Sequence, residues 1–207
     1  ELNMDYYMIR VKKVYINLFI LTGLLFPVNL VVEPYLQDAT PNSMHILWET
    51  DSYAESILEW GMYVFLSEQT IGSSIINYGN SRIHTVELTD LEPSTRYYYR
   101  VMYENEYSDL YDFITPPEPS SEAAFRIVAM SDMQRDNSNA NKFNEIIHDG
   151  VIDYISEEYS DDLAAELAMV LVTGDLVVTG TSYYQWQDHF FEPSKDLFSH
   201  VPLYPVF

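Results

Sequence analysis

The chain has 207 residues, of which 47% are hydrophobic and 15% are aromatic. This length and composition predict one or two domains with packed cores and argue against a disordered chain, because the apolar surface can offset the ordering entropy. The formal net charge is −22, with only 10 lysines and arginines. We therefore expect no nucleic-acid binding, which needs clustered basic side chains. The absence of cysteine excludes disulfides, zinc–thiolate sites and thiol nucleophiles.

The N-terminal segment, residues 1–30, is predicted to be a signal peptide or an N-terminal anchor. Three basic residues between positions 10 and 13 directly precede the mostly apolar stretch 14–32. A basic region followed by an apolar run is typical of an export signal, although this run is marginal as a membrane span. We therefore expect a secreted, periplasmic or cell-envelope protein. The alternative is that a buried first strand begins at Val28.

Residues 31–115 have the pattern of short β-strands. Apolar and polar residues alternate from Met44 to Trp48, and turn-forming stretches separate the segments. About seven such segments in this length predict a β-sandwich. Trp48 is expected to be a core aromatic residue.

The stretch "DLEPSTRYYYRV" resembles a corner between two strands of fibronectin type III domains. At that corner a tyrosine hydroxyl bonds to upstream backbone, and the matching residue here is Tyr97. By the period of two along a strand, Tyr97, Tyr99 and Val101 are expected to share the buried face.

The proline-rich stretch 116–124 is predicted to be a linker, because proline cannot continue a central strand. In residues 125–207, buried apolar strands are expected at "FRIVAMSD", "LAMVLVTGD" and "VPLYPVF". Helical periodicity lies between them, with Tyr154 on the apolar stripe of the first helical stretch and a break at Pro193 in the second. This β-α-β-α-β order predicts a parallel sheet with right-handed crossovers.

The first two of these strands each end on an aspartate, Asp132 and Asp175. Ligands of open parallel sheets bind beyond the carboxyl ends of the strands, so two neighbouring strand ends can direct two carboxylates into one crevice. Two such anions repel each other unless cations lie between them, and hard divalent metals suit an oxygen-rich site. For either aspartate alone, ordinary turn or helix-cap chemistry is the alternative.

The motifs "SDMQ", "LVTGD" and "HVPLYPVF", in this order, resemble the calcineurin-like metallophosphoesterase superfamily. The preceding sandwich resembles the N-terminal domain of purple acid phosphatases, so the resemblance covers nearly all of residues 31–207. It implies two domains: an all-β fibronectin III-like sandwich, followed by the first β-α-β-α-β part of an α/β metallophosphoesterase fold.

The resemblance also implies a metal site. Asp132 would bind the first of two divalent ions, and Asp175 would bridge both; manganese, zinc, iron and magnesium are all open. Gln134 stands where many members of the superfamily have a histidine ligand. Val178 occupies the position of the tyrosine that binds iron in true purple acid phosphatases, so a tyrosinate–iron centre is not expected. Arg135 could contact a substrate phosphate, or it could be a surface residue.

The implied function of the full protein is metal-dependent, acid phosphatase-like hydrolysis of phosphate esters. The third motif, with its catalytic histidine, is expected after Phe207, so this chain is expected to be a catalytically incomplete N-terminal part. The five histidines present are expected to be surface or packing residues. The alternative is a non-catalytic extracellular binding or adhesion module with a degenerate phosphoesterase-like domain. The substrate, the metal, the oligomeric state and cleavage of the N-terminal segment remain open.

Overall fold

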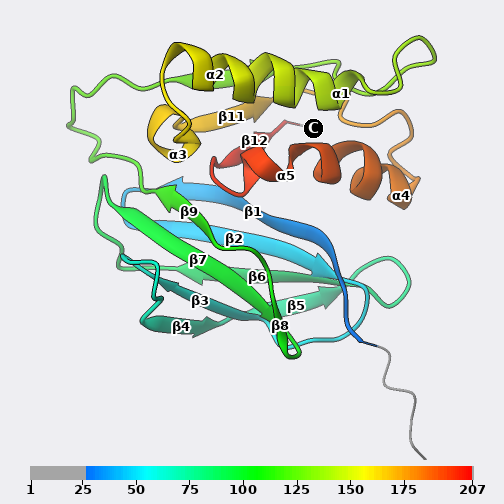
Figure 1. The fold of residues 1–207 in the computed structure, drawn as a ribbon. Helices are drawn as coiled ribbons and strands as arrows, with labels where there is room; N and C mark the ends of the chain where they lie inside the picture. Colours follow the sequence, from blue (N-terminus) through cyan, green and yellow to red (C-terminus); the bar gives the residue numbers. More distant parts are fainter. Residues whose placement is uncertain (1–26, 207) are drawn as a thin grey trace, which may run out of the picture.

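The computed structural model describes residues 27–206 and shows a β-sandwich with an α/β unit packed on it (Figure 1). The predicted signal or anchor segment lies mostly outside the described residues. The first strand begins at Leu30, and Val28 is already buried with 5% of its surface exposed, so the sandwich includes the last residues of that segment. No helix in the described part of the chain is both long and apolar enough to cross a membrane.

The predicted β-sandwich is confirmed, and it consists of two antiparallel sheets. One sheet has the order β1 (Leu30–Thr40), β2 (Ser43–Thr50), β6 (Arg82–Leu88) and β5 (Ser73–Ile76). The other has the order β4 (Glu68–Ile71), β3 (Ile57–Gly61), β7 (Arg96–Tyr103) and β8 (Glu106–Tyr107), and β9 (Tyr111–Ile114) also pairs with β7. The nine strands exceed the expected number because β4, β5 and β8 are short edge strands with little apolar alternation.

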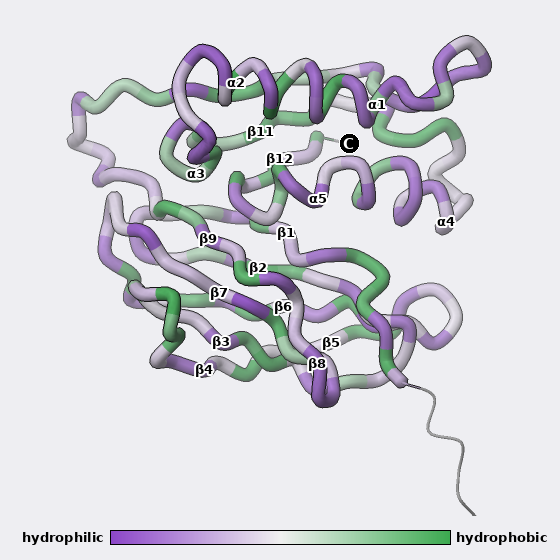
Figure 2. The backbone as a smooth tube through the Cα atoms, in the orientation of Figure 1, coloured by the Kyte–Doolittle hydropathy of each residue, from purple (hydrophilic) through white to green (hydrophobic). Residues whose placement is uncertain are grey.

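The sandwich core follows the alternation of the sequence. Trp48, Tyr99 and Val101 have no exposed surface and Tyr97 has 3%, so the predicted buried face is confirmed. The backbone N–H of Glu92 donates a hydrogen bond of 2.9 Å to the Tyr97 hydroxyl, which is the predicted corner contact. Figure 2 shows hydrophobic and hydrophilic positions alternating along these strands.

Replacing Tyr97 by phenylalanine should lower the free energy of unfolding by about 1 kcal/mol, because the Glu92 N–H loses its acceptor while the ring packing is kept. Urea denaturation followed by circular dichroism measures this change. Tyr98→Phe is the matched control: the hydroxyl of this neighbouring tyrosine makes no hydrogen bond within residues 27–206, so the effect should stay below about 0.5 kcal/mol. Equal effects of the two substitutions would contradict the role of the corner contact.

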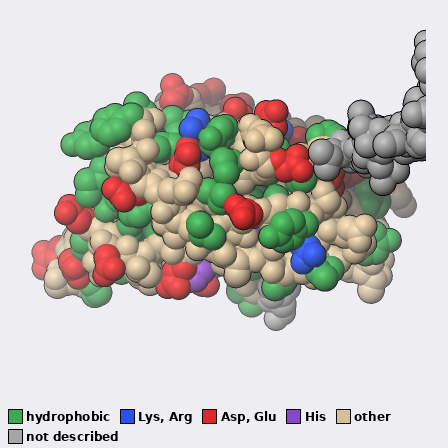
Figure 3. All heavy atoms as spheres, turned by 90° about the horizontal axis from the view of Figure 1, so that it is seen from below, with side chains coloured by type: hydrophobic (Ala, Val, Ile, Leu, Met, Phe, Trp, Pro, Cys, Tyr) green, Lys and Arg blue, Asp and Glu red, His purple; other side chains and the backbone are tan. Residues whose placement is uncertain are grey.

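The outer face of the sandwich, on the side away from the α/β unit, carries exposed hydrophobic side chains among scattered acidic ones (Figure 3). At the turn between β3 and β4, Tyr63, Val64 and Phe65 are 62–71% exposed, and the rings of Tyr63 and Phe65 stack at 5.2 Å. Basic side chains are sparse on this face (Figure 3). These turn residues contribute nothing to the sandwich core.

The α/β unit contains a parallel sheet of β10 (Ile127–Met130), β11 (Met169–Val172) and β12 (Leu203–Pro205), in that order. The predicted parallel pairing is present: Met130 lies opposite Val172, which lies opposite Pro205. The prediction of a buried first strand is wrong, because β10 has only one neighbouring strand among residues 27–206. Val128 and Met130 pack against the core, whereas Ile127 on the opposite face is 46% exposed.

Both predicted helical stretches are present, and each contains a π-helical segment. The first comprises α1 (Lys142–Glu145), η1 (Ile146–Ile152) and α2 (Asp153–Glu158), the second α4 (Tyr183–Trp186), η2 (Gln187–Phe191) and α5 (Glu192–Phe198); a short helix, α3 (Leu163–Glu166), precedes β11. The predicted break at Pro193 is wrong: Pro193 lies at the start of α5, where the missing N–H and the ring are tolerated after the wide π-turn.

The π-helical turn also changes which residues of the first stretch face the core. Phe143, Ile147, Val151 and Ile155, spaced by four residues, are buried. Tyr154 is 54% exposed, so its expected place on the apolar stripe is wrong. A turn of π-helix holds more residues than a turn of α-helix, which favours a spacing of four and carries Tyr154 off the buried face.

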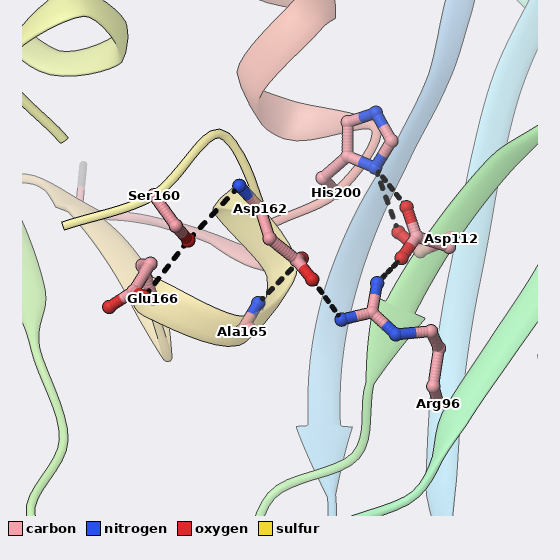
Figure 4. A network of polar contacts seen from close by, with 7 residues as sticks. All are labelled: Arg96, Asp112, Ser160, Asp162, Ala165, Glu166 and His200. Atoms are coloured by element: carbon pink, nitrogen blue, oxygen red, sulfur yellow. Dashed lines mark hydrogen bonds and ion pairs between the residues drawn. The ribbon is translucent and has the colours of Figure 1, made fainter. Parts of the chain in front are cut away.

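The two units share a polar interface, shown in Figure 4. Arg96 on β7 forms ion pairs with Asp112 on β9 and, at 2.6 Å, with Asp162 at the start of α3. His200, which follows α5, lies 2.7 Å from the same Asp112 carboxylate. The buried Tyr99 hydroxyl donates a bond of 2.7 Å to the carbonyl that follows α5. These contacts hold the sandwich against the helices of the α/β unit.

Candidate functional site

The two predicted metal motifs meet at the carboxyl ends of β10 and β11. The backbone N–H of Thr173 donates to the carbonyl of Met130 at 3.0 Å, which extends the pairing of the strands. Beyond it, the backbone N–H of Gln134 donates to the carbonyl of Asp175 at 3.2 Å. The segments after the two strands are therefore joined directly, as expected for neighbouring parallel strands.

Asp132 and Asp175 both adopt the left-handed backbone conformation, with φ of 55° and 51°. This region disfavours residues other than glycine, although aspartate tolerates it better than most. The conformation costs on the order of 1 kcal/mol and persists where neighbouring structure imposes it, often at ligand sites. The chain therefore turns sharply at both aspartates, just after each strand ends.

Both carboxylates are exposed and have few protein partners. The Ser131 hydroxyl donates to Asp132 at 2.7 Å, and within residues 27–206 the carboxylate of Asp175 accepts no hydrogen bond. The Lys142 ammonium donates to the backbone carbonyl of Asp132 and not to its carboxylate. Neither aspartate caps a helix, because the N-cap residues of α1 and α4 are an asparagine and a serine. The helix-cap alternative is therefore wrong for both residues, whereas their left-handed backbone is compatible with the turn alternative.

Gln134 follows Asp132 by two residues, and its backbone lies beside that of Asp175. Its side-chain Oε1 atom is buried and has no hydrogen-bond partner in the described part of the chain. A buried acceptor without a partner is costly and calls for an explanation, such as a water or an ion. Two carboxylates and an amide oxygen are hard donors that suit magnesium or manganese. The donor set therefore fits a divalent cation.

The described residues do not supply a complete metal site by themselves. Between residues 27 and 206, no group of three or more His, Asp or Glu side chains is arranged to hold a metal. Asp132, Gln134 and Asp175 would thus provide part of a coordination shell.

Arg135 lies beside a different hollow, a cavity of about 290 Å³ between α1 and the start of α5. This cavity is also lined by His148, His189 and Glu192, but by none of the three predicted metal ligands. His189 is 7% exposed and neither ring nitrogen has a partner among the described residues. Burial, and then the nearby Arg135, lower the pKa of His189, which favours the neutral form of the ring.

Two contacts of the segments around the predicted ligands have no local sequence signal. Lys142 reaches the backbone of Asp132, and Tyr183, after the loop that carries Asp175, contacts Glu49 of the sandwich. Both contacts depend on how distant segments pack, so no local pattern reveals them.

The fold defines a protein with an N-terminal β-sandwich and a following α/β unit whose strand ends carry aspartates. Residues 31–115 match the family model described as purple acid phosphatase, N-terminal domain. The sandwich is thus similar to that domain. No curated protein matches the chain in sequence.

Solved structures match the chain at low sequence identity. A structure of PhoD matches with a TM-score of 0.54 and 14% identity over 85% of this chain and 38% of the PhoD chain. The chain thus spans well under half the length of PhoD, and the similarity extends over both units. The sensor domain of the anti-sigma factor RsgI4 from Pseudobacteroides cellulosolvens matches 45% of this chain and 99% of its own, with 20% identity and a TM-score of 0.35.

Proposed function

We propose that the full protein is an exported metallophosphoesterase of the calcineurin-like type that hydrolyses phosphate esters. In this proposal the chain supplies the sandwich (31–115), a linker (116–124) and the first part of the catalytic domain (125–207). The observation that carries it is the backbone bond from Gln134 to Asp175, which joins two strand-end motifs behind a sandwich similar to that of purple acid phosphatases.

Each residue of the site has a distinct role in the proposal. The carboxylates of Asp132 and Asp175 provide the negative charge that retains two divalent cations, and the Gln134 amide oxygen adds a neutral donor. When bound, such metals supply Lewis-acid polarisation of the phosphate ester and a nucleophile near neutral pH. The three proposed ligands include no basic side chain, so a phosphate would meet a repulsive field from a chain of net charge −22 unless cations are present. Arg135 is proposed as a secondary phosphate contact.

The second candidate function is a non-catalytic extracellular binding or adhesion module. Glutamine at position 134, in place of a histidine ligand, favours it. The two candidates differ in what they predict for metal binding and for hydrolysis.

Asp175→Asn should weaken binding of manganese by more than about tenfold, because the site loses a negative charge between the proposed ions. Titration of the metal-free full-length gene product with Mn²⁺, followed by electron paramagnetic resonance, measures the affinity. Asp149→Asn removes the same charge from an exposed position on η1 and should leave the affinity within about twofold. Equal affinities for both variants, or no binding by the unmodified full-length protein, would exclude this metal site.

Hydrolysis is tested on the full-length gene product loaded with manganese or zinc. The proposal expects turnover of p-nitrophenyl phosphate or of its bis ester, and loss of that turnover with Asp175→Asn. A metal-loaded protein that hydrolyses neither ester would instead support the binding module.

A further inference from the structure

Tyr183, the first residue of α4, packs against the sandwich, where it contacts Glu49 and Tyr78. Its hydroxyl donates a hydrogen bond to the Glu49 carboxylate on β2. Its ring stacks on the ring of Tyr78 at 5.3 Å with an interplanar angle of 21°. Burial, and then the bond to Glu49, raise the pKa of the Tyr183 hydroxyl, so it stays a proton donor at every physiological pH. The Tyr183 side chain of the α/β unit therefore contacts two residues of the sandwich, Glu49 and Tyr78.

Glu49 is a buried carboxylate whose hydrogen bonds come from uncharged donors. It is 3% exposed and takes part in none of the ion pairs found in residues 27–206. Its two oxygens accept from the Asn77 amide, at 3.1 Å, and from Tyr183. A buried charge is costly unless its hydrogen bonds are made, so loss of the Tyr183 hydroxyl leaves one oxygen unsatisfied.

Hydrogen bonds also connect α4, which begins at Tyr183, to the loop that carries Asp175. The backbone N–H of Thr179 donates to the Gln185 side chain at 2.9 Å, and the Trp186 indole donates to the carbonyl of Gly180 at 2.8 Å. Both partners lie in α4, so the loop is fastened to the helix that Tyr183 begins. A chain of contacts thus runs from the sandwich through α4 to the residues that follow Asp175.

We propose that Tyr183 is a positioning residue through which Glu49 of the sandwich holds the loop of residues 173–182, and with it Asp175, in place. The sandwich then acts on the site by fixing one of its ligands. The effect on metal affinity rests on the proposed function, but the positioning of the loop does not.

Tyr183→Phe tests the proposal, because it removes the hydroxyl and keeps the ring that stacks on Tyr78. Hydrogen exchange of the backbone amides of residues 176–182 should become about tenfold faster, while exchange in β2 and β6 should stay unchanged. The affinity for Mn²⁺ should fall by about fivefold in parallel. Tyr184→Phe is the control: this neighbour is 52% exposed and its hydroxyl makes no hydrogen bond within the described residues, so neither quantity should change.

Glu49→Gln identifies the partner. It keeps an acceptor for Tyr183, so hydrogen exchange of residues 176–182 should rise by less than in Tyr183→Phe. When Glu49→Gln is added to Tyr183→Phe, this exchange should change by less than about twofold, because the contact is already lost. Loop exchange in Tyr183→Phe equal to that of the unmodified chain would overturn the proposal, as would faster exchange throughout both units. If the unmodified full-length protein binds no Mn²⁺, the proposed function fails, while the exchange experiment still decides the role of Tyr183.

Discussion

Phe190→Ala should lower the free energy of unfolding by about 3–5 kcal/mol, because it empties the centre of the core of the α/β unit. Phe190 is 1% exposed, and its ring stacks on Phe143 at 5.5 Å. Trp186, Phe191 and Phe198 surround it with ring centroids within 6.1 Å. No small movement of one helix can fill a cavity bounded by four aromatic rings.

Urea denaturation followed by circular dichroism measures this effect. Phe190→Leu keeps much of the volume and should cost about 1–2 kcal/mol, while Tyr154→Ala on the exposed side of α2 should cost less than about 1 kcal/mol. The ion pairs Arg96–Asp162 and Asp112–His200 couple the two units, so the sandwich should unfold in the same transition. An alanine variant as stable as the unmodified chain would contradict the core described above.

The features that sequence predicts correctly are those set by residues close together in the chain. Alternation with a period of two placed Trp48, Tyr97 and Tyr99 in the sandwich core, and the corner bond from Glu92 to Tyr97 spans five residues. The order of apolar strands and helical stretches likewise specified parallel pairing of β10 with β11. That pairing is why two aspartates far apart in sequence could be expected at one edge of the sheet.

The features that sequence reasoning missed depend on distant packing or on small shifts in helical register. The π-helical turns of η1 and η2 have no sequence signature, yet they moved Tyr154 off the buried face and removed the break expected at Pro193. The Tyr183–Glu49 contact spans 134 residues and is formed only when the sandwich and the α/β unit pack together. The shared edge of the sheet was therefore predictable, whereas the contacts that position the loops around it were not.

His84 should make the sandwich sensitive to acid. Its ring has no exposed surface and stacks on Trp48 at 4.9 Å. The Thr50 hydroxyl donates to the carbonyl of Ser52, so it is free to accept from His84 Nε2 at 2.8 Å, and the Ser56 hydroxyl then donates to Nδ1 at 2.8 Å. This arrangement is satisfied by a neutral ring. Burial, with a smaller contribution from Arg82, lowers the pKa of His84 from 6.5 to about 4.

The direction of the pH effect follows from that lowered pKa. Above about pH 6.5 the ring is neutral in both the folded and the unfolded chain, so it adds no pH dependence. As the pH falls, His84 is protonated in the unfolded chain but stays neutral in the folded chain. Stability is therefore lost between about pH 6.5 and about pH 4. The loss is about 2 kcal/mol at about pH 5 and about 3 kcal/mol below about pH 4.

His84→Gln isolates this contribution from that of the many carboxylates, because an amide offers a donor and an acceptor but does not titrate. The glutamine variant should be less stable than the unmodified chain at about pH 7.5, and this difference should shrink by about 2 kcal/mol at about pH 5. Urea denaturation at the two pH values gives both differences. A difference between His84→Gln and the unmodified chain that stays constant with pH would mean that the folded sandwich accepts the proton, which the two hydroxyl partners and the stacked indole oppose.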